Sequence, residues 1–376
     1  MSSALPQRPA WIEIDLEALR KNFGAIHAQK KPALKIISVL KDDAYGHGAG
    51  AVAGVAIQSG AALLALGTVD EAEKLRAAGS QHPILLLGER APGELEYCVA
   101  HDLACCVGSI DTARSLAPLA ARAGKNFPIH LEIDTGMNRF GVRWDDLTSF
   151  LPEFRALPSL QLDGVMSHFA MSDERDKSFA LLQLKRFEEV LGVLKTQGMA
   201  PPLRHICNSG GFLDLPQAHF EAVRLGLLPL GIYPSQVCRR LDFLQPVMSV
   251  KTRIAAMKKL RPGDSVGYGM RYTAPEERRI AVLPLGYGDG FPRTRNDGSV
   301  LVRGCRAPLV GSVSMDAMTV DISEIPGAQL WDEVVVMGRQ GDLEISVHEI
   351  ARLKNTVSYE VLTNWRARLP RLYLNS

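Results

Sequence analysis

The chain lacks any apolar run long enough to span a membrane and any long block of one charge. Among its 376 residues, 43 Lys and Arg stand against 41 Asp and Glu, which leaves a net charge of +2. Spanning a bilayer takes about 20 successive apolar residues, and nucleic-acid binding usually requires a basic patch. No apolar leader precedes the first strand-like segment either. The sequence therefore predicts a cytoplasmic protein that binds a small molecule, and neither membrane nor nucleic acid.

The cysteines and histidines lack the paired spacing of metal ligands. Six cysteines are scattered through mostly apolar surroundings without a CxxC pair, and nine histidines form no HExxH pattern. Scattered cysteines of this kind are typical of reduced thiols rather than of a disulfide framework. A metal site is not expected, since neither pattern of ligands is present.

Strand-like and helical segments alternate through the longer, N-terminal part of the chain. Short apolar runs are separated by segments such as VDEAEKLRAAG, whose apolar positions recur at three- and four-residue intervals. The expected strands are Lys35–Lys41, Leu63–Thr68, Pro83–Gly88, Ala104–Gly108, Pro128–Asp134, Gln161–His168, Leu203–Asn208 and Ala222–Leu227. This alternation implies parallel pairing, and eight repeats without a GxGxxG motif favour a closed (β/α)8 TIM-type barrel over an open sheet.

The sequence changes character near residue 240, where strand-like runs with glycine and proline turns replace the alternation. A chain of this length is expected to form two domains. We place a barrel domain at residues 1–240 and a mostly β domain at residues 241–376. The early WIEIDL segment, at residues 11–16, could return to pair with the second domain.

Lys41 follows the first buried run of the barrel, in the segment IISVLKDDAYGHG. Lysine is usually exposed, so the simplest reading of Lys41 alone is a surface side chain. In a barrel, however, the chemistry lies at the carboxyl ends of the strands. The polar residues expected at those ends are Lys41, Tyr45, Arg139, His168, Asn208, Ser209 and Arg224. Lys41 is therefore interpreted as a functional residue at the barrel mouth.

Nine motifs, in order along the chain, carry a resemblance to a known family. They are LKDDAYGHG, HLEIDTGMNRFGV, MSHFA, CNSGG, VRLGLLPLGIYPS, SVGYGMRYTA, LPLGYGDGFPR, VGSVSMDAM and SYEVLTNWRARLPR. Together they resemble the motifs of the alanine racemase family, fold-type III pyridoxal-phosphate enzymes. The resemblance covers almost the whole chain and implies a homodimeric isomerase that interconverts L- and D-alanine and supplies D-alanine for cell-wall peptidoglycan.

The resemblance implies that Lys41 carries pyridoxal 5'-phosphate as a Schiff base. The chemistry agrees, because loss of the Cα proton of an amino acid leaves a negative charge that an imine conjugated to a ring can spread. Once the substrate displaces it, the lysine becomes a free amine and can act as a general base on one face of the substrate.

The resemblance assigns the second base of a two-base mechanism to Tyr268, in the SVGYG motif. In this family the tyrosine reaches the active site of the other subunit of a homodimer. Read without the motif, a tyrosine between two glycines is more simply a packed turn residue. A phenol needs cationic or hydrogen-bonding neighbours to act as a base near neutral pH. The matching neighbours are His168 and Arg224.

The resemblance also implies that Arg224 faces the pyridine nitrogen of the cofactor, where the family places an arginine. Because a guanidinium keeps its proton, the ring nitrogen would remain unprotonated. An unprotonated ring is a weaker electron sink, so the carbanion lives for a shorter time. Transamination and elimination are then disfavoured, and the enzyme is confined to proton exchange. The alternative is a structural salt bridge.

The remaining site residues are implied by the resemblance as well. The phosphate contacts would be Tyr45, Ser209, the backbone amides of Gly226 and Leu227, and Tyr359. Arg139 would bind the phenolic oxygen of the cofactor and approach the substrate carboxylate. Met315, from the partner subunit, would close the substrate side through its backbone, with Tyr287 at the mouth and Asp316 nearby.

Two positions differ from the usual family motifs. Many members have a lysine, often carbamylated, where this chain has Glu132, and cysteine is common where it has Ser314. Glu132 supplies a carboxylate without modification, and we expect it to point to the same mouth as Arg139 and to pair with it. The alternative is a buried counter-charge without effect on the rate.

Other functions of the same fold remain open. A non-catalytic pyridoxal-phosphate carrier would resemble the first domain only, so Tyr268 and Met315 in the second domain argue against it. A broad-specificity or serine racemase would differ only in the pocket, where Tyr287 and Tyr359 predict a small site suited to alanine. Decarboxylases of this fold type are disfavoured because the GYG and SMDAM motifs fit the racemases.

Overall fold

A computed structural model describes residues 8–375, which form two compact units. The barrel unit contains residues 19–44 and 49–245. The β unit contains residues 8–18, 45–48 and 246–375. The chain therefore crosses between the units just after Lys41.

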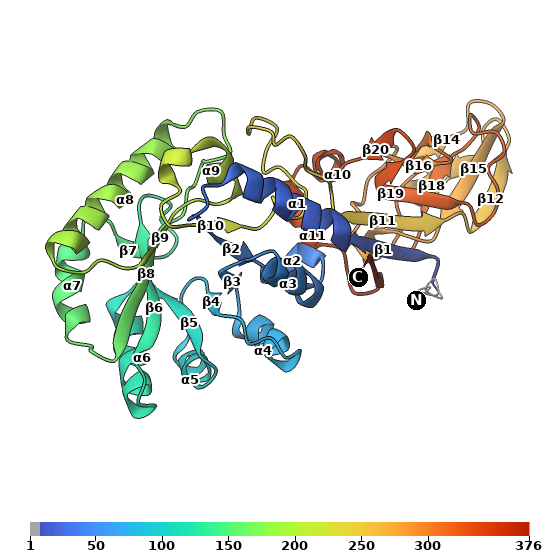
Figure 1. Cartoon of the computed structure of the whole chain (residues 1–376). Helices are drawn as coiled ribbons and strands as arrows, with labels where there is room; N and C mark the ends of the chain where they lie inside the picture. Colours follow the sequence, from blue (N-terminus) through green and yellow to red (C-terminus); the bar gives the residue numbers. More distant parts are fainter. Residues whose placement is uncertain (1–7, 376) are drawn as a thin grey trace. The chain divides into compact units, whose positions relative to one another are not determined.

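The barrel unit is a nearly closed barrel of eight parallel strands with helices around it, as the sequence predicts (Figure 1). In spatial order the strands are β10 (Ala222–Leu225), β2 (Lys35–Val39), β3 (Leu63–Leu66), β4 (Ile84–Leu86), β5 (Leu103–Val107), β6 (Phe127–Asp134), β8 (Leu160–Met166) and β9 (Leu203–His205). The short β7 (Val142–Arg143) pairs with β6. Every residue of β5 is buried, as expected for a strand covered on both faces.

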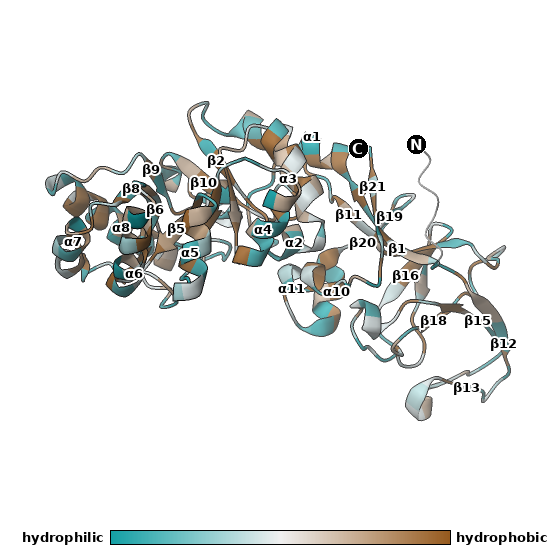
Figure 2. Cartoon of the chain, turned by 90° about the horizontal axis from the view of Figure 1, so that it is seen from below, coloured by the Kyte–Doolittle hydropathy of each residue, from teal (hydrophilic) through white to brown (hydrophobic). Residues whose placement is uncertain are grey.

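The helices of the barrel unit turn apolar faces to these strands. They are α1 (Leu16–Gln29), α3 (Ala49–Gln58), α4 (Val69–Ala77), α5 (Pro92–Ala100), α6 (Ile110–Arg122), α7 (Leu147–Arg155), α8 (Ser178–Thr196) and α9 (Ser209–Asp214), with the 3-10 turn η1 (Pro216–Ala218). The buried positions of α6 follow helical spacing and are Ala113, Leu116, Ala117 and Ala120. Figure 2 shows apolar and polar positions together on α6. After α6, Gly124 adopts φ +64°, the left-handed conformation that ends many helices.

Lys41 opens α2 (Lys41–Gly46), which is a turn of left-handed rather than right-handed helix. The residues with φ between +51° and +54° are Asp42, Asp43, Ala44 and Tyr45. For L residues this conformation costs roughly 1–2 kcal/mol each, so the surrounding structure must hold the turn. The strand predicted at Lys35–Lys41 is therefore too long at its C-terminal end, because β2 stops at Val39. The predicted ends of β9 and β10 are also too late, since the chain leaves the ladder where its polar side chains enter the mouth.

The β unit is mostly β, as predicted. Its largest sheet has the order β17 (Cys305–Pro308), β16 (Ser299–Val302), β19 (Glu333–Gln340), β11 (Met248–Arg253), β1 (Ala10–Asp15) and β21 (Arg371–Leu374), with β20 (Leu343–Ile345) on β19. The smaller sheets are β12 (Ala256–Leu260), β15 (Arg278–Leu283) and β18 (Met318–Asp321), and β13 (Ser265–Val266) with β14 (Tyr272–Thr273). Its helical elements are η2 (Tyr268–Met270), η3 (Tyr287–Asp289), α10 (Val347–Lys354) and α11 (Ser358–Thr363). β1, from the WIEIDL segment, lies between β11 and β21.

None of the helices within residues 8–375 has the length and apolar character to cross a membrane. In the same range, no group of three or more His, Cys, Asp or Glu side chains could hold a metal ion. The cysteines are all free, and only Cys305 is exposed.

Candidate active site

Lys41 stands at the carboxyl end of β2, at the mouth of the barrel. Burial lowers the pKa of its ammonium below the ordinary lysine value, and the Arg139 guanidinium lowers that pKa further. The side chain nevertheless keeps access to solvent. The neutral amine, which is the form that can attack a carbonyl or accept a proton, is therefore easier to form at the mouth than on an ordinary lysine.

The left-handed turn that carries Lys41 is tied to the neighbouring strand by Glu71. One carboxylate oxygen of Glu71 accepts the Asp42 N–H at 2.5 Å, and the other accepts the Gly67 N–H at 2.8 Å. Glu71 also forms a capping box with Thr68 at the start of α4. The sequence analysis missed Glu71, although a Thr followed three residues later by a Glu is a visible capping signal.

Arg224 is 3% exposed and lies in a chain of three histidines. Its Nη2 donates to His168 Nδ1 at 3.0 Å, and its Nη1 donates to His205 Nδ1 at 2.7 Å. His205 Nε2 lies 2.8 Å from His130 Nδ1. Because guanidinium can only donate, both of its histidine partners accept through Nδ1. When neutral, each therefore carries its proton on Nε2, and His205 donates onward to His130.

Burial beside Arg224 keeps these histidines neutral. Burial, and after it the charge of Arg224, lowers the pKa of His130 from 6.5 to about 4. The same two causes hold the pKa values of His168 and His205 well below the ordinary value. The sequence analysis identified His168 and Arg224 but missed His130 and His205. The two-residue spacing of His130 and Glu132, which puts both on one face of β6, was an available signal.

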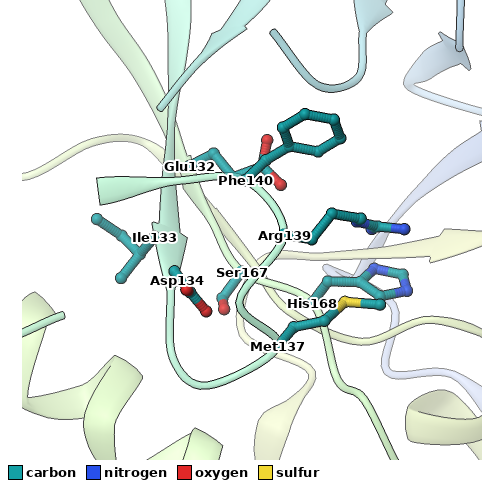
Figure 3. Close-up of a pocket in the computed structure, with 8 residues that line it drawn as sticks. All are labelled: Glu132, Ile133, Asp134, Met137, Arg139, Phe140, Ser167 and His168. Atoms are coloured by element: carbon teal, nitrogen blue, oxygen red, sulfur yellow. The ribbon is translucent and has the colours of Figure 1, made fainter. Parts of the chain in front are cut away.

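Glu132, Arg139 and His168 line one small cavity at the mouth (Figure 3). Its volume of about 10 Å³ is close to the space of one water molecule. The remaining lining residues are Ile133, Asp134, Met137, Phe140 and Ser167. Arg139 and His168 extend toward the same side in Figure 3. The described residues show no hydrogen bond between Glu132 and Arg139, so the expected pair is not a direct contact in this structure.

The Glu132 carboxyl is subject to opposing effects. Burial raises its pKa, whereas the guanidinium groups of Arg224 and Arg139 act in the opposite direction. The side chain is 6% exposed and shares its cavity with Arg139. A single water in this cavity could join the carboxylate to the guanidinium.

A group of hydrogen-bond donors lies where β9 and β10 end. Ser209 is buried, and its hydroxyl accepts the Leu228 N–H at 3.4 Å. The N–H groups of Gly226 and Leu227 donate to no acceptor among the described residues. Amides inside a protein are rarely left unpaired. This set of donors therefore fits an anionic group such as a phosphate.

The β unit carries the other residues that the sequence analysis singled out. Tyr268, at the start of η2, is 72% exposed, and Met315 is 52% exposed. Tyr45 and Tyr359 pack edge to face with their ring centroids 6.0 Å apart. The unit therefore offers an exposed tyrosine and methionine on its surface and a separate tyrosine pair.

Tyr287 and Met315 stand on two loops whose backbones are joined. The Tyr287 N–H donates to the Ser314 carbonyl at 3.0 Å, and the Gly288 N–H donates to the Met315 carbonyl at 2.8 Å. The Ser314 hydroxyl donates to the Ala317 carbonyl at 2.7 Å. Ser314, one of the two departures from the family motif, thus helps to close its own turn.

Two of the supporting residues have structural partners. Asn208 caps α9, where its side-chain oxygen accepts the Gly211 N–H at 2.9 Å. Asp316 forms an ion pair with Arg368 at 2.5 Å. The sequence analysis missed Arg368, which lies three residues before the end of the SYEVLTNWRARLPR motif.

Comparisons with known proteins cover nearly the whole chain. The family models described as alanine racemase, N-terminal domain, and alanine racemase, C-terminal domain, match residues 14–234 and 247–373. The alanine racemase of Syntrophobacter fumaroxidans is 42% identical over 353 residues, which cover 94% of each chain. The solved alanine racemase of Clostridium difficile has a TM-score of 0.93 at 32% identity and covers 98% of this chain and 96% of its own. That of Bacillus anthracis, with bound L-Ala-P, has a TM-score of 0.92 at 35% identity, with 99% and 97% covered.

Proposed function

This chain belongs to the alanine racemase family, and we propose that it interconverts L- and D-alanine with pyridoxal 5'-phosphate by a two-base mechanism. Its fold and family make it an amino-acid racemase, an isomerase. The observation that carries the proposal is Lys41, a solvent-accessible lysine at the barrel mouth whose pKa is lowered by burial and by the Arg139 guanidinium.

The residues at the mouth fit the cofactor. Lys41 would hold it covalently, and the unpaired amides beside Ser209 would receive its phosphate. The full set of phosphate contacts would be Tyr45, Ser209, Gly226, Leu227 and Tyr359. When bound, the group supplies a conjugated ring that spreads the charge left by the lost Cα proton.

Arg224 is the group that would face the pyridine nitrogen. Both ends of its guanidinium are held, one by His168 and the other by His205, so its orientation is fixed. Because it stays charged and keeps its protons, it would donate a hydrogen bond without transferring a proton. Because the pyridine nitrogen would then stay unprotonated, proton exchange would be favoured over transamination or elimination.

Two groups would move the Cα proton, one on each face of the substrate. Lys41 would take or return it on one face, and Tyr268 of a partner subunit would do so on the other. His168 supports the tyrosine because its neutral ring accepts from Arg224 through Nδ1 and so carries its proton on Nε2. That N–H would donate to the Tyr268 oxygen and favour the phenolate.

Substrate binding would use the carboxylate of alanine. Arg139 would pair with it, and the Met315 N–H of the partner subunit would donate to it. Glu132 would hold Arg139 through the small cavity that both line. Tyr287 and Tyr359 would limit the pocket to a small side chain. We place the enzyme in the cytoplasm as a homodimer that supplies D-alanine for the cell wall.

The decisive experiment measures D-to-L and L-to-D exchange for a panel of amino acids, with and without added pyridoxal 5'-phosphate. We expect cofactor-dependent racemisation with alanine as the best substrate and serine well behind it. Equal rates for serine and alanine would replace the proposal with a broad-specificity racemase. Cofactor binding without exchange of any amino acid would instead indicate a carrier.

A further inference from the structure

Arg368 connects the two loops that bear Tyr287 and Met315. Its Nη2 pairs with Asp316 at 2.5 Å, and its Nε lies 3.5 Å from Asp289. Asp289 ends the short η3 turn that begins at Tyr287, and it is completely buried. Asp316 directly follows Met315. One guanidinium therefore bridges carboxylates from both loops.

The two loops also approach so closely that only glycine fits between them. A Cβ added to Gly286 would lie 2.2 Å from the Ser314 carbonyl oxygen. A Cβ added to Gly288 would lie 2.9 Å from the Met315 carbonyl oxygen. Contacts between backbones cannot relax by a change of rotamer. A shift of one loop is therefore passed to the other.

The turn at Met315 leaves two backbone N–H groups without a partner among the described residues. The Ser314 N–H donates to the Ala317 carbonyl at 2.9 Å, and the Ala317 N–H donates to the Ser314 hydroxyl at 3.1 Å. Between them, the N–H groups of Met315 and Asp316 donate to no acceptor in the part of the chain that the structure describes. A donor on a turn with fixed ends is suited to an anionic acceptor.

We propose that Arg368 is a positioning residue for substrate binding: by bridging Asp316 and Asp289, it fixes the Met315 N–H where that group meets the substrate carboxylate. The proposal rests on the proposed function and adds a residue to the same site. A planar guanidinium can bind two carboxylates at once, whereas an ammonium is a single point charge. The geometry of the bridge therefore favours arginine over lysine.

Exposure argues against a purely stabilising role for this pair. The side chain of Arg368 is 45% exposed and that of Asp316 is 65% exposed. Exposed ion pairs contribute about 0–1 kcal/mol to stability. The buried Asp289 is instead held mainly by Arg8, whose Nη1 and Nη2 donate to its two oxygens at 2.6 and 2.7 Å. Loss of Arg368 should thus alter the position of the turn more than the stability of the unit.

Arg8 provides a comparison variant: it binds the same carboxylate of Asp289 and also the Arg368 carbonyl, but it has no contact to the Met315 turn. The experiment compares the holoenzymes of wild type, Arg368→Gln, Arg368→Lys and Arg8→Gln. We expect Arg368→Gln to raise the KM for alanine about tenfold, the value of one charge-assisted hydrogen bond. The Ki of acetate, a carboxylate that does not react, should rise in parallel, while kcat stays within about twofold.

Three further results complete the test. Arg368→Lys should recover part of the KM. Arg8→Gln, which removes the main partner of Asp289 and a bond to the Arg368 carbonyl, should lower the melting temperature more than Arg368→Gln does while raising the KM less. Because Arg368 acts through Asp316, Asp316→Asn combined with Arg368→Gln should raise the KM no further than either change alone. A wild-type KM and acetate Ki in Arg368→Gln, or additive effects in the double variant, would overturn the proposal. Failure of the proposed function can be told apart from failure of the Arg368 proposal, because in that case the wild type itself would not exchange alanine.

Discussion

At the residue scale, the charge of Arg224 organises the barrel mouth. The neighbouring histidines are held neutral by burial and then by this charge. Burial also raises the pKa of Cys207 to about 12, so that this thiol stays protonated. A permanent cation surrounded by neutral groups keeps a fixed pattern of donors over a wide pH range. This constancy suits the proposed reaction, in which Lys41 and Tyr268 would carry the proton transfers.

The neutral state of His130 makes a testable contribution to stability. Its folded pKa of about 4 lies below the ordinary 6.5, so the unfolded state binds the proton first as the pH falls. The stabilisation is therefore complete above pH 6.5 and is lost between 6.5 and 4, with a total of about 3 kcal/mol. We expect urea unfolding to show a smaller pH dependence in this window for His130→Asn than for wild type. Replacing His101, which is exposed, should leave that dependence unchanged, and equal slopes for His130→Asn and wild type would contradict the assignment.

Glu132 is expected to act through Arg139 and to need no carbon dioxide. Glu132→Gln keeps the shape of the side chain but removes its negative charge, so Arg139 should lose its orientation. We predict a several-fold higher KM for alanine in this variant, measured by steady-state kinetics, and a wild-type rate that is indifferent to bicarbonate. Wild-type efficiency in the variant would contradict the role of Glu132 in orienting Arg139. Reversible inactivation of the wild type by bicarbonate depletion would contradict its independence of carbon dioxide.

At the element scale, the left-handed turn α2 positions Lys41. Its conformation is unfavourable for each of its L residues, and contacts from outside the turn hold it in place. Glu71 fixes one end through the Asp42 N–H, and Arg371 Nε donates to the Gly46 carbonyl at the other end at 2.7 Å. The turn is therefore a product of tertiary contacts, and it should respond to changes at its ends.

Gly46 is the residue at which this dependence can be tested. It has φ +78°, and an added Cβ would lie 2.5 Å from the Leu362 carbonyl oxygen. Gly60 is a matched control, since it has φ +80° and no atom within 4 Å of the added Cβ. We expect Gly60→Ala to cost about 1 kcal/mol of unfolding free energy and Gly46→Ala to cost clearly more. Gly46→Ala should also weaken cofactor retention on dialysis, and equal behaviour of the two variants would contradict a positional role for the turn.

The same elements show which parts of the fold can be predicted from sequence. Buried runs such as β5, and the helical spacing of α6, arise from local patterns, so the barrel and its strand order along the chain were predictable. The conformation of α2 was not, because Asp42, Ala44 and Tyr45 carry no local signal for a whole left-handed turn. His205 was missed for a similar reason: its role depends on Arg224, which reaches it from the neighbouring strand in space.

At the scale of the whole molecule, the groups expected to act on the substrate are divided between the two units. Lys41, Arg139 and Arg224 belong to the barrel unit, whereas Tyr268 and Met315 belong to the β unit and are exposed. Tyr268 is 72% exposed and Met315 is 52% exposed, so both side chains are accessible to a second molecule at the surface. A second copy of the chain, bound through this surface, would bring both bases to one substrate.

Subunit mixing tests this division directly. Lys41→Ala and Tyr268→Phe should each give an inactive homodimer in the racemisation assay. If Tyr268 acts in the partner's site, a mixed dimer has one site with both defects and one site with neither. Random pairing should then restore about one quarter of the wild-type activity, because half of the dimers are mixed and each has one intact site of two. Mixing Lys41→Ala with the Lys41→Ala/Tyr268→Phe double variant is the control and should restore nothing. Absence of recovery after verified subunit exchange would mean that Tyr268 serves the barrel of its own chain.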